Sequence, residues 1–359
     1  MKRYNRHIVL PEIGKQGQNK ISAARVLVIG AGGLGCPVLM YLAAAGVGTL
    51  GIIDFDVVEE SNLQRQVLFG NSSLGLNKAL MAKERLNDLN PTINIDAYPE
   101  RLTSVNALDL FNNYDIVVDG SDNFGTRYLV NDASIITKTP LVYGAIYKFE
   151  GQLSVFNYDE GPSYRCLFST PPKAGTVPNC DEIGVLGVLP GIIGTMQANE
   201  VLKIILQNEG VLSGRLLCYD SRSAKFYEIG VKRSDSLINK VLKDGLVQSN
   251  PDYQDESCLN EVPEIGFEKA MELNDAIFID IREAYENPKL DLSGLKQIPM
   301  GQIESEIDKF KSPRPKIVLC ETGIRSKTAV AFLEQRGVTN CYSLRGGIKA
   351  INNLNAYIL

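Results

Sequence analysis

Histidine is almost absent from this sequence of 359 residues, which contains only His7. Histidine-rich metal sites are therefore excluded, and a Ser-His-Asp or Cys-His catalytic device would have to use His7. The seven cysteines include no C-x-x-C pair, and such a dispersed, odd set predicts reduced thiols in the cytoplasm. An excess of positive charge is also lacking, because 37 Lys and Arg face 42 Asp and Glu, a net charge of -5. This balance argues against binding to nucleic acid or to an anionic membrane.

Apolar runs that suit a signal peptide or a membrane span are lacking as well. The N-terminus leads into no apolar run, so we expect no signal peptide. Residues 26–53 carry no charge and are long enough to span a bilayer, but seven glycines and Pro37 interrupt them. The segment is better interpreted as strand, helix and strand. With 44% hydrophobic and 22% charged residues, the composition is that of a globular protein of two domains.

Strand and helix patterns alternate from about residue 25 to residue 228. Val26–Gly30 is a continuous apolar run that ends at glycine, as expected of a strand buried on both faces. The alternation predicts an α/β fold, a doubly wound and mostly parallel sheet with helices on both faces. Leu153–Phe156 and Leu216–Ile229 have antiparallel character, so we expect a mixed sheet. We predict a first domain at 1–231, a polar linker at 232–260 with one short amphipathic piece, and a smaller α/β domain at 261–359.

A glycine-rich loop follows the first predicted strand. Gly30-Ala-Gly-Gly-Leu-Gly35 fits the pattern G-x-G-x-x-G between a strand and a helix. Its glycines permit close approach of a phosphate to the backbone, and the helix N-terminus favours negative charge. Asp54, at the end of the next strand, suits a ribose hydroxyl. This pattern alone supports an NAD-dependent oxidoreductase as well as other nucleotide enzymes.

Charged residues after the later strands favour a nucleoside triphosphate over a nicotinamide cofactor. Arg65 and Lys78 follow the second predicted strand, and Asp122 follows the strand that ends at Asp119. Cations of this kind neutralise the β and γ phosphates, and an aspartate holds magnesium. All of them are expected at the carboxyl edge of the sheet, where doubly wound sheets bind their ligands.

Six segments together resemble the MoeB/ThiF/HesA adenylyltransferase family, relatives of the ubiquitin-activating enzymes. They are Arg3-Tyr-Asn-Arg6, Gly30–Gly35, DFDVVEESNLQRQ from Asp54, Lys78, DGSDNFGTR ending at Arg127, and Thr176–Gly194. The resemblance covers about residues 3–231 and implies a Rossmann-like fold. It also implies that ATP activates the C-terminal glycine of a ubiquitin-like sulfur carrier protein, similar to MoaD or ThiS and ending in Gly-Gly, as an acyl-adenylate.

The resemblance also assigns roles to individual residues. Asp122 would bind Mg²⁺, Asp54 the ribose, and Arg65 and Lys78 the triphosphate. Arg6 would act on the phosphates of the other subunit, which implies a homodimer. The ATP site as a whole would comprise Gly30, Gly32, Gly33, Leu34, Gly35, Asp54, Asp56, Asn62, Arg65, Gln66, Lys78, Asp122 and Asn123.

Two features depend on cysteines of this first region. Many members of the family bind a structural zinc through two C-x-x-C pairs, but this chain has Ser163-Tyr-Arg-Cys166 and no second pair after Val231. We therefore expect no zinc, and interpret Cys166 as a buried apolar remnant. Cys180 lies in a loop that crosses the adenylate site in the family. There it is a candidate to take up the activated carboxylate or to form a persulfide link.

A second reactive cysteine is predicted in the C-terminal domain. Cys320-Glu-Thr-Gly-Ile-Arg325 follows a strand and leads into a helix, so its backbone N–H groups would form an anion nest. The helix dipole and Arg325 would favour a thiolate. This loop resembles the active loop of rhodanese domains, as Phe278–Glu283 and Leu344–Ile348 resemble other rhodanese segments. The usual His-Ile-Pro-Gly-Ala stretch is present only as Gln297-Ile-Pro-Met-Gly301.

The hypothesis that unites these features is a fused enzyme of two steps. The first domain would adenylylate the carrier with ATP and Mg²⁺, and a persulfide on Cys320 would convert the adenylate to a thiocarboxylate for molybdopterin biosynthesis. The persulfide donor would be a protein such as a cysteine desulfurase. Alternatives are the same chemistry for thiamine or another thio-product, an NAD-dependent oxidoreductase, or a non-catalytic adaptor that binds the carrier.

Overall fold

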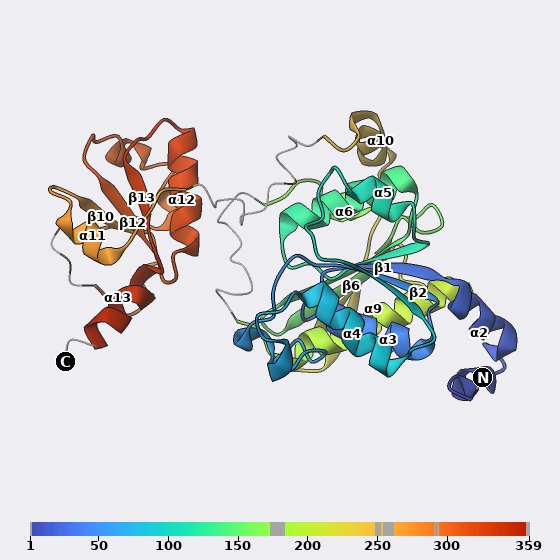
Figure 1. Ribbon diagram of the computed structural model, residues 1–359. Helices are drawn as coiled ribbons and strands as arrows, with labels where there is room; N and C mark the ends of the chain where they lie inside the picture. Colours follow the sequence, from blue (N-terminus) through green and yellow to red (C-terminus); the bar gives the residue numbers. More distant parts are fainter. Residues whose placement is uncertain are drawn as a thin grey trace. The chain divides into compact units, whose positions relative to one another are not determined.

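The computed structural model describes residues 2–172, 184–247, 253, 262–290, 292 and 294–356. They form two compact units, and Figure 1 shows the sheet and helices of each. The first unit holds residues 2–171, 184–247 and 253, and the second holds residue 172 and the described residues from 262 onward. Within the described ranges, no helix is both long and apolar enough to cross a lipid bilayer.

An eight-stranded sheet forms the centre of the first unit. Its strand order is β3-β2-β1-β4-β5-β6-β7-β8. The pairs from β3 to β5 are parallel and those from β5 to β8 are antiparallel, which confirms the predicted mixed sheet. The strands are β1 (Arg25–Ile29), β2 (Thr49–Ile53), β3 (Asn94–Tyr98), β4 (Ile116–Asp119), β5 (Leu141–Tyr147), β6 (Glu150–Phe156), β7 (Arg215–Asp220) and β8 (Lys225–Gly230).

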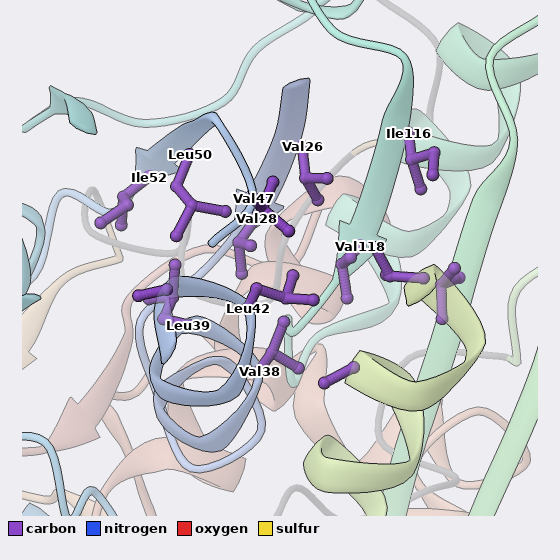
Figure 2. Close-up of a cluster of buried hydrophobic side chains, with 14 of the residues drawn as sticks. Val26, Val28, Val38, Leu39, Leu42, Val47, Leu50, Ile52, Ile116 and Val118 are labelled. Carbon is purple, nitrogen blue, oxygen red and sulfur yellow. The ribbon is translucent and has the colours of Figure 1, made fainter. Parts of the chain in front are cut away.

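Helices cover both faces of this sheet (Figure 1). They are α1 (Asn5–Ile8), α2 (Gly14–Ala23), α3 (Gly35–Ala45), α4 (Lys78–Leu89), α5 (Ala107–Phe111), α6 (Phe124–Thr137), α7 (Tyr164–Leu167), α9 (Val188–Leu206) and α10 (Asp235–Asp244). Val26 and Val28 of β1 pack toward α3 and α9, a core that Figure 2 shows. Leu27 and Ile29 pack toward α5 and α6 on the other face. Successive side chains of a strand point to opposite faces, so a strand apolar throughout must be covered twice, as the sequence predicted.

Helix α10 lies at the start of the predicted linker. Its Ile238 and Val241 are buried against Ile135 of α6. This amphipathic helix has an apolar face that must be buried, and the first unit supplies the surface. Residues 235–244 therefore pack on the first unit, although the sequence placed them in a polar connection. Beyond the helix, the hydroxyl of Tyr253 donates to Asp132 at 2.7 Å.

The second unit is a smaller α/β fold with a five-stranded sheet of order β11-β10-β12-β13-β9, parallel throughout. Its strands are β9 (Glu264–Ile265), β10 (Ile277–Asp280), β11 (Lys296–Gln297), β12 (Lys316–Leu319) and β13 (Cys341–Leu344). Its helices are α11 (Phe267–Glu272), α12 (Ile324–Gln335) and α13 (Gly347–Ala356). The central strand β12 and its neighbour β10 are buried along their whole length, as parallel strands covered on both faces should be.

Candidate nucleotide and sulfur sites

The glycine-rich loop joins β1 to α3 at the carboxyl edge of the first sheet. Gly30 has φ +87°, in the left-handed region that favours glycine. A Cβ on Gly35 would lie 1.9 Å from the carbonyl oxygen of Gly30, so the first turn of α3 crosses directly over the loop. Only glycine fits there. The loop thus presents backbone N–H groups at a helix N-terminus, the arrangement that binds phosphate.

Asp54 supports this loop from the end of β2. Its carboxylate accepts hydrogen bonds from the backbone N–H of Ala31 at 2.7 Å and of Asp56 at 2.9 Å. The side chain is buried, and burial raises the pKa of Asp54, an effect that the nearby Lys78 opposes. Asp54 therefore fixes the loop against β2, a role beyond the ribose contact that the resemblance implies.

Lys78 begins α4 and turns toward the same edge. Its ammonium group lies 3.2 Å from a carboxylate oxygen of Asp56. The Lys78 side chain is 9% exposed while that of Asp56 is 51% exposed, so the pair is open to solvent only on the aspartate side. Asn77, which sequence reasoning missed, caps α4 and donates to the backbone carbonyls of both Asp54 and Asp56 at 3.1 Å. An N-cap residue before a helix was the available signal.

Arg65 and Gln66 lie against the glycines of the loop. A Cβ on Gly33 would be 3.6 Å from Cδ of Arg65, and one on Gly32 would be 3.8 Å from Nε2 of Gln66. Gln66 is buried, and its Oε1 has no hydrogen-bond partner among the described residues. Asn62 is buried beside them and accepts from the backbone N–H of Glu59. The structure thus brings the predicted polar residues of 62–66 to the loop.

Asp122 and Asn123 follow β4, the next strand along the same edge. Asp122 is exposed, while Asn123 caps α6 by accepting from the backbone N–H of Thr126 at 2.8 Å. Arg127 lies one turn into α6, donates to the carbonyl of Ser121 and packs over the rings of Phe124 and Tyr143. Sequence reasoning gave Arg127 no role. Its contacts support the loop that carries Asp122.

Arg6 lies at the opposite end of the sheet from this loop. It is exposed on α1, two residues after Tyr4. The Tyr4 ring fills the space where a Cβ of Gly46 would be, and its hydroxyl accepts from Asn90 at 2.8 Å. Gly46 and Asn90 precede β2 and β3, so they mark the amino edge of the parallel strands. The structure therefore does not bring Arg6 to the site of its own chain.

Cys166 lies where the resemblance would place the first C-x-x-C pair of a zinc site. Its sulfur is hydrogen-bonded to two segments of the first unit. Sγ of Cys166 accepts from the backbone N–H groups of Ser163 at 3.3 Å and Ser234 at 3.2 Å. Cys166 is half-buried and packs against apolar clusters of the first unit, as expected of an apolar remnant, but its sulfur is also hydrogen-bonded. Among the residues that the structure describes, no three His, Cys, Asp or Glu side chains are grouped as a metal site requires. The absence of zinc stays a prediction.

In the second unit, the loop of Cys320 closes around its sulfur. Cys320 is fully buried, and Sγ accepts from the backbone N–H groups of Gly323 at 3.2 Å and Ser326 at 3.4 Å. Gly323 has φ +95°, and Ser326 bonds the carbonyl of Gly323 at 2.9 Å and the hydroxyl of Ser343 at 2.8 Å. The backbone amides thus point at the sulfur, as the predicted anion nest requires.

Two arginines beside this loop are bound to carboxylates. Arg325 makes two hydrogen bonds to Glu286, at 2.8 and 2.7 Å, and its hydrogen bonds hold the pKa of Glu286 below the ordinary glutamate value. Arg282 is buried and paired with Asp280 at 2.9 Å and Glu321 at 3.2 Å. Sequence reasoning missed Glu286, which is 39 residues from Arg325 along the chain. Cys180, the other predicted reactive cysteine, lies outside the described residues.

Comparison with known families agrees with this division into two sites. The model of the ThiF family matches residues 4–238, and that of the rhodanese-like domain matches residues 266–354. The chain therefore belongs to the ThiF family and carries a C-terminal rhodanese-like domain. Both resemblances predicted from the motifs are confirmed.

Similar curated proteins have names that specify the chemistry. A probable adenylyltransferase/sulfurtransferase MoeZ of Mycobacterium tuberculosis is 40% identical over 366 residues, covering 97% of this chain and 92% of that protein. A sulfur carrier protein adenylyltransferase of Thermus thermophilus is 52% identical over 237 residues, covering 65% of this chain and 88% of that one. The prediction of an enzyme with adenylyltransferase and sulfurtransferase activities is confirmed.

Solved structures of similar fold include Escherichia coli MccB with ATP. It is 22% identical, with a TM-score of 0.55, and the match covers 60% of this chain and 67% of that one. At this identity the likeness shows the fold alone, the α/β architecture predicted from the alternation of strands and helices.

Proposed function

We propose that the first unit adenylylates the C-terminal glycine of a ubiquitin-like sulfur carrier and that the second unit supplies the sulfur for its thiocarboxylate, which serves molybdopterin biosynthesis. The observation that carries this proposal is the gathering of Asp54, Arg65 and Lys78 around a glycine loop at a helix N-terminus. Membership of the ThiF family supports ATP as the nucleotide. The names of the adenylyltransferase relatives support the sulfur carrier as substrate.

The first step requires charge neutralisation and positioning more than proton transfer. An oxygen of the glycine carboxylate attacks the α-phosphorus of ATP, the bond from that phosphorus to the bridging oxygen breaks, and pyrophosphate leaves. The attacking carboxylate is already ionised, so no general base is needed. Lys78 and Arg65 would offset the charge of the phosphates, and ATP would compete with Asp56 for the ammonium group of Lys78.

Magnesium fits the residues present at this edge. Mg²⁺ is usually held by one or two carboxylates together with substrate phosphates and water, not by a full protein cage. Asp122 is an exposed carboxylate after β4, and no group of three acidic side chains surrounds it in the described chain. Asp122 would hold the ion. When bound, the ion would neutralise charge on the phosphates, while Arg127 steadies the loop of Asp122.

The second step would transfer sulfur from Cys320. The terminal sulfur of a Cys320 persulfide attacks the acyl carbon, and AMP leaves with the electrons of the broken C–O bond. The product is an acyl disulfide between the carrier and Cys320. A thiol, for which Cys180 is the candidate, then attacks the Cys320 sulfur and releases the thiocarboxylate. The resulting disulfide is reduced by an external thiol.

The position of Arg6 supports a homodimer. Each strand of the sheet spans on the order of 15 Å, more than an arginine side chain reaches, so Arg6 at the amino edge is too far from its own glycine loop. A second subunit would supply it in trans.

The cysteines that the structure describes support a location in the cytoplasm. All of them are free thiols: Cys36, Cys166, Cys218, Cys320 and Cys341.

The decisive experiment measures carrier-dependent ATP–pyrophosphate exchange, followed by mass spectrometry of candidate carriers. With ATP and a persulfidated cysteine desulfurase, one carrier should gain the mass of a glycine thiocarboxylate. A MoaD-like carrier is expected to react, and a ThiS-like carrier reacting instead would move the enzyme to the thiamine pathway. Exchange that occurs without any carrier, or a spectral change of a nicotinamide, would contradict the proposal.

A further inference from the structure

The rhodanese-like unit has an unusual distribution of charge around its reactive sulfur. Rhodanese chemistry takes a sulfane sulfur from a donor, and the donor can be an inorganic dianion, thiosulfate, or an organic persulfide. A dianion needs an uncompensated positive charge near the acceptor sulfur, whereas a persulfide on a thiol carrier does not. The charges beside Cys320 therefore bear on which donor the loop accepts.

The arginines that could receive a dianion are already neutralised. Arg325, the second residue of α12 after the Cys320 loop, is held by both carboxylate oxygens of Glu286. Both side chains of this pair are only 22% exposed, so water screens the pair weakly. Planar two-point pairing is the strong geometry for arginine and carboxylate, and a small anion in water would compete poorly with it.

The second arginine, Arg282, is paired with two carboxylates. Arg282, 1% exposed, is bound to Asp280 and also to Glu321, the residue directly after Cys320. Two guanidinium groups thus face three carboxylates. Lys327, in the first turn of α12, is paired with Glu264 at 3.0 Å. Arg345 and Lys349, on the segment behind the loop, are exposed, where solvent screens their charge.

We propose that Glu286 and Glu321 are specificity-determining residues that exclude the dianion thiosulfate, so that Cys320 takes its sulfur from a persulfide of an organic thiol, whose outer sulfur carries at most one negative charge. This inference rests on the proposed function, in which Cys320 carries the sulfur. In the transfer, the Cys320 thiolate attacks the outer sulfur of the persulfide. The S–S bond of the donor breaks, and the donor thiol leaves with the electron pair.

The test compares three donors on the full-length protein. They are thiosulfate, glutathione persulfide as a small-molecule source, and a persulfidated cysteine desulfurase as a protein source. Mass spectrometry of the Cys320 peptide measures the rate at which one sulfur atom is added. The wild-type chain should react much faster with an organic persulfide than with thiosulfate, and the faster of the two persulfides identifies the source.

Substitution of either glutamate should relax this discrimination. In Glu286→Gln and in Glu321→Gln, the second-order rate with thiosulfate should rise about tenfold, because one negative charge is removed near a reacting anion. The rate with the persulfidated desulfurase should change far less. Glu286→Asp, which keeps the charge, should stay close to wild type. Glu304→Gln, which breaks the exposed pair with Arg336, is the matched control and should change neither rate.

The inference is overturned if thiosulfate loads wild-type Cys320 as fast as the persulfides, or if neither glutamine variant changes the ratio of the rates. Failure of the proposed function looks different. In that case no donor of any charge would add sulfur to Cys320, and the inference would fall with the function on which it rests.

Discussion

The nucleotide loop and the sulfur loop have the same construction and treat charge in opposite ways. Each connects a buried parallel strand to a helix, and each needs a glycine with positive φ, Gly30 or Gly323. At the nucleotide loop, Lys78 is paired with the half-exposed Asp56. At the sulfur loop, Arg282 is paired with Asp280, which is nearly as buried as the arginine itself.

The difference matches what each loop must hold. A nucleoside triphosphate brings several negative charges from solution, so its cations must be able to exchange partners. A sulfur attached to Cys320 needs no such capture, because the covalent bond already holds it and the backbone amides stabilise its charge. The same strand–loop–helix unit can therefore be specialised by the carboxylates placed around it.

The largest effect should come from the sulfur loop. In Cys320→Ala, persulfide-dependent formation of the thiocarboxylate should fall by at least about 10³-fold, because the nucleophile is lost. ATP–pyrophosphate exchange in the first unit should continue. Cys341→Ala is the control, since burial raises the pKa of Cys341 to about 11 and keeps its thiol protonated. Sulfur transfer that persists in Cys320→Ala would remove the second loop from the chemistry.

The corresponding change in the first unit is Asp122→Ala. Carrier-dependent exchange should fall by about 10²–10³-fold, the usual cost of removing one group that stabilises developing charge. The control is Asp109→Ala, an exposed aspartate on α5. Loading of Cys320 with sulfur should be unchanged. Full exchange in Asp122→Ala would show that Asp122 does not hold the magnesium ion that the reaction uses.

Backbone crowding gives a test of stability at the nucleotide loop. Gly35→Ala would bring a Cβ to 1.9 Å from the Gly30 carbonyl, so we expect the free energy of unfolding of the first unit to fall by about 2–4 kcal/mol. Gly70→Ala has no heavy atom within 4 Å of the new Cβ and should change it by less than about 0.5 kcal/mol. Urea unfolding can be followed by alkylation of buried Cys36. An equal loss of unfolding free energy in Gly35→Ala and Gly70→Ala would show that backbone crowding at Gly35 is not the cause.

The smallest effect concerns pH at the sulfur loop. Arg325 lowers the pKa of Glu286, so this pair stabilises the folded state above the ordinary glutamate pKa, and that contribution is lost as the pH falls through the lowered value. Glu286→Gln should therefore cost about 1 kcal/mol near neutral pH and nothing well below pH of about 4. Alkylation of Cys341 in urea reports the second unit. If Glu286→Gln lost the same unfolding free energy at every pH, the negative charge of Glu286 would not be the origin of its contribution to stability.

The sequence predicted what depends on local pattern. The apolar run of β1 and the glycine spacing gave the sheet, the loop and the order of elements, because burial on two faces and close backbone approach each require particular residue types. It could not predict the pairing of Arg325 with Glu286 or the packing of α10 on α6. These contacts join segments far apart in the chain, and an exposed or paired glutamate has the same sequence signature.

The contact of Tyr4 with Gly46, at the C-terminal end of α3, has a consequence for how the enzyme works in dilute solution. It keeps Arg6 at the edge of the sheet remote from the glycine loop of its own chain. In the proposed homodimer each adenylation centre is then assembled from two polypeptides, and a lone subunit holds an incomplete one. Specific activity should depend on protein concentration, and two defective chains, one lacking Arg6 and the other Asp122, should restore activity when mixed.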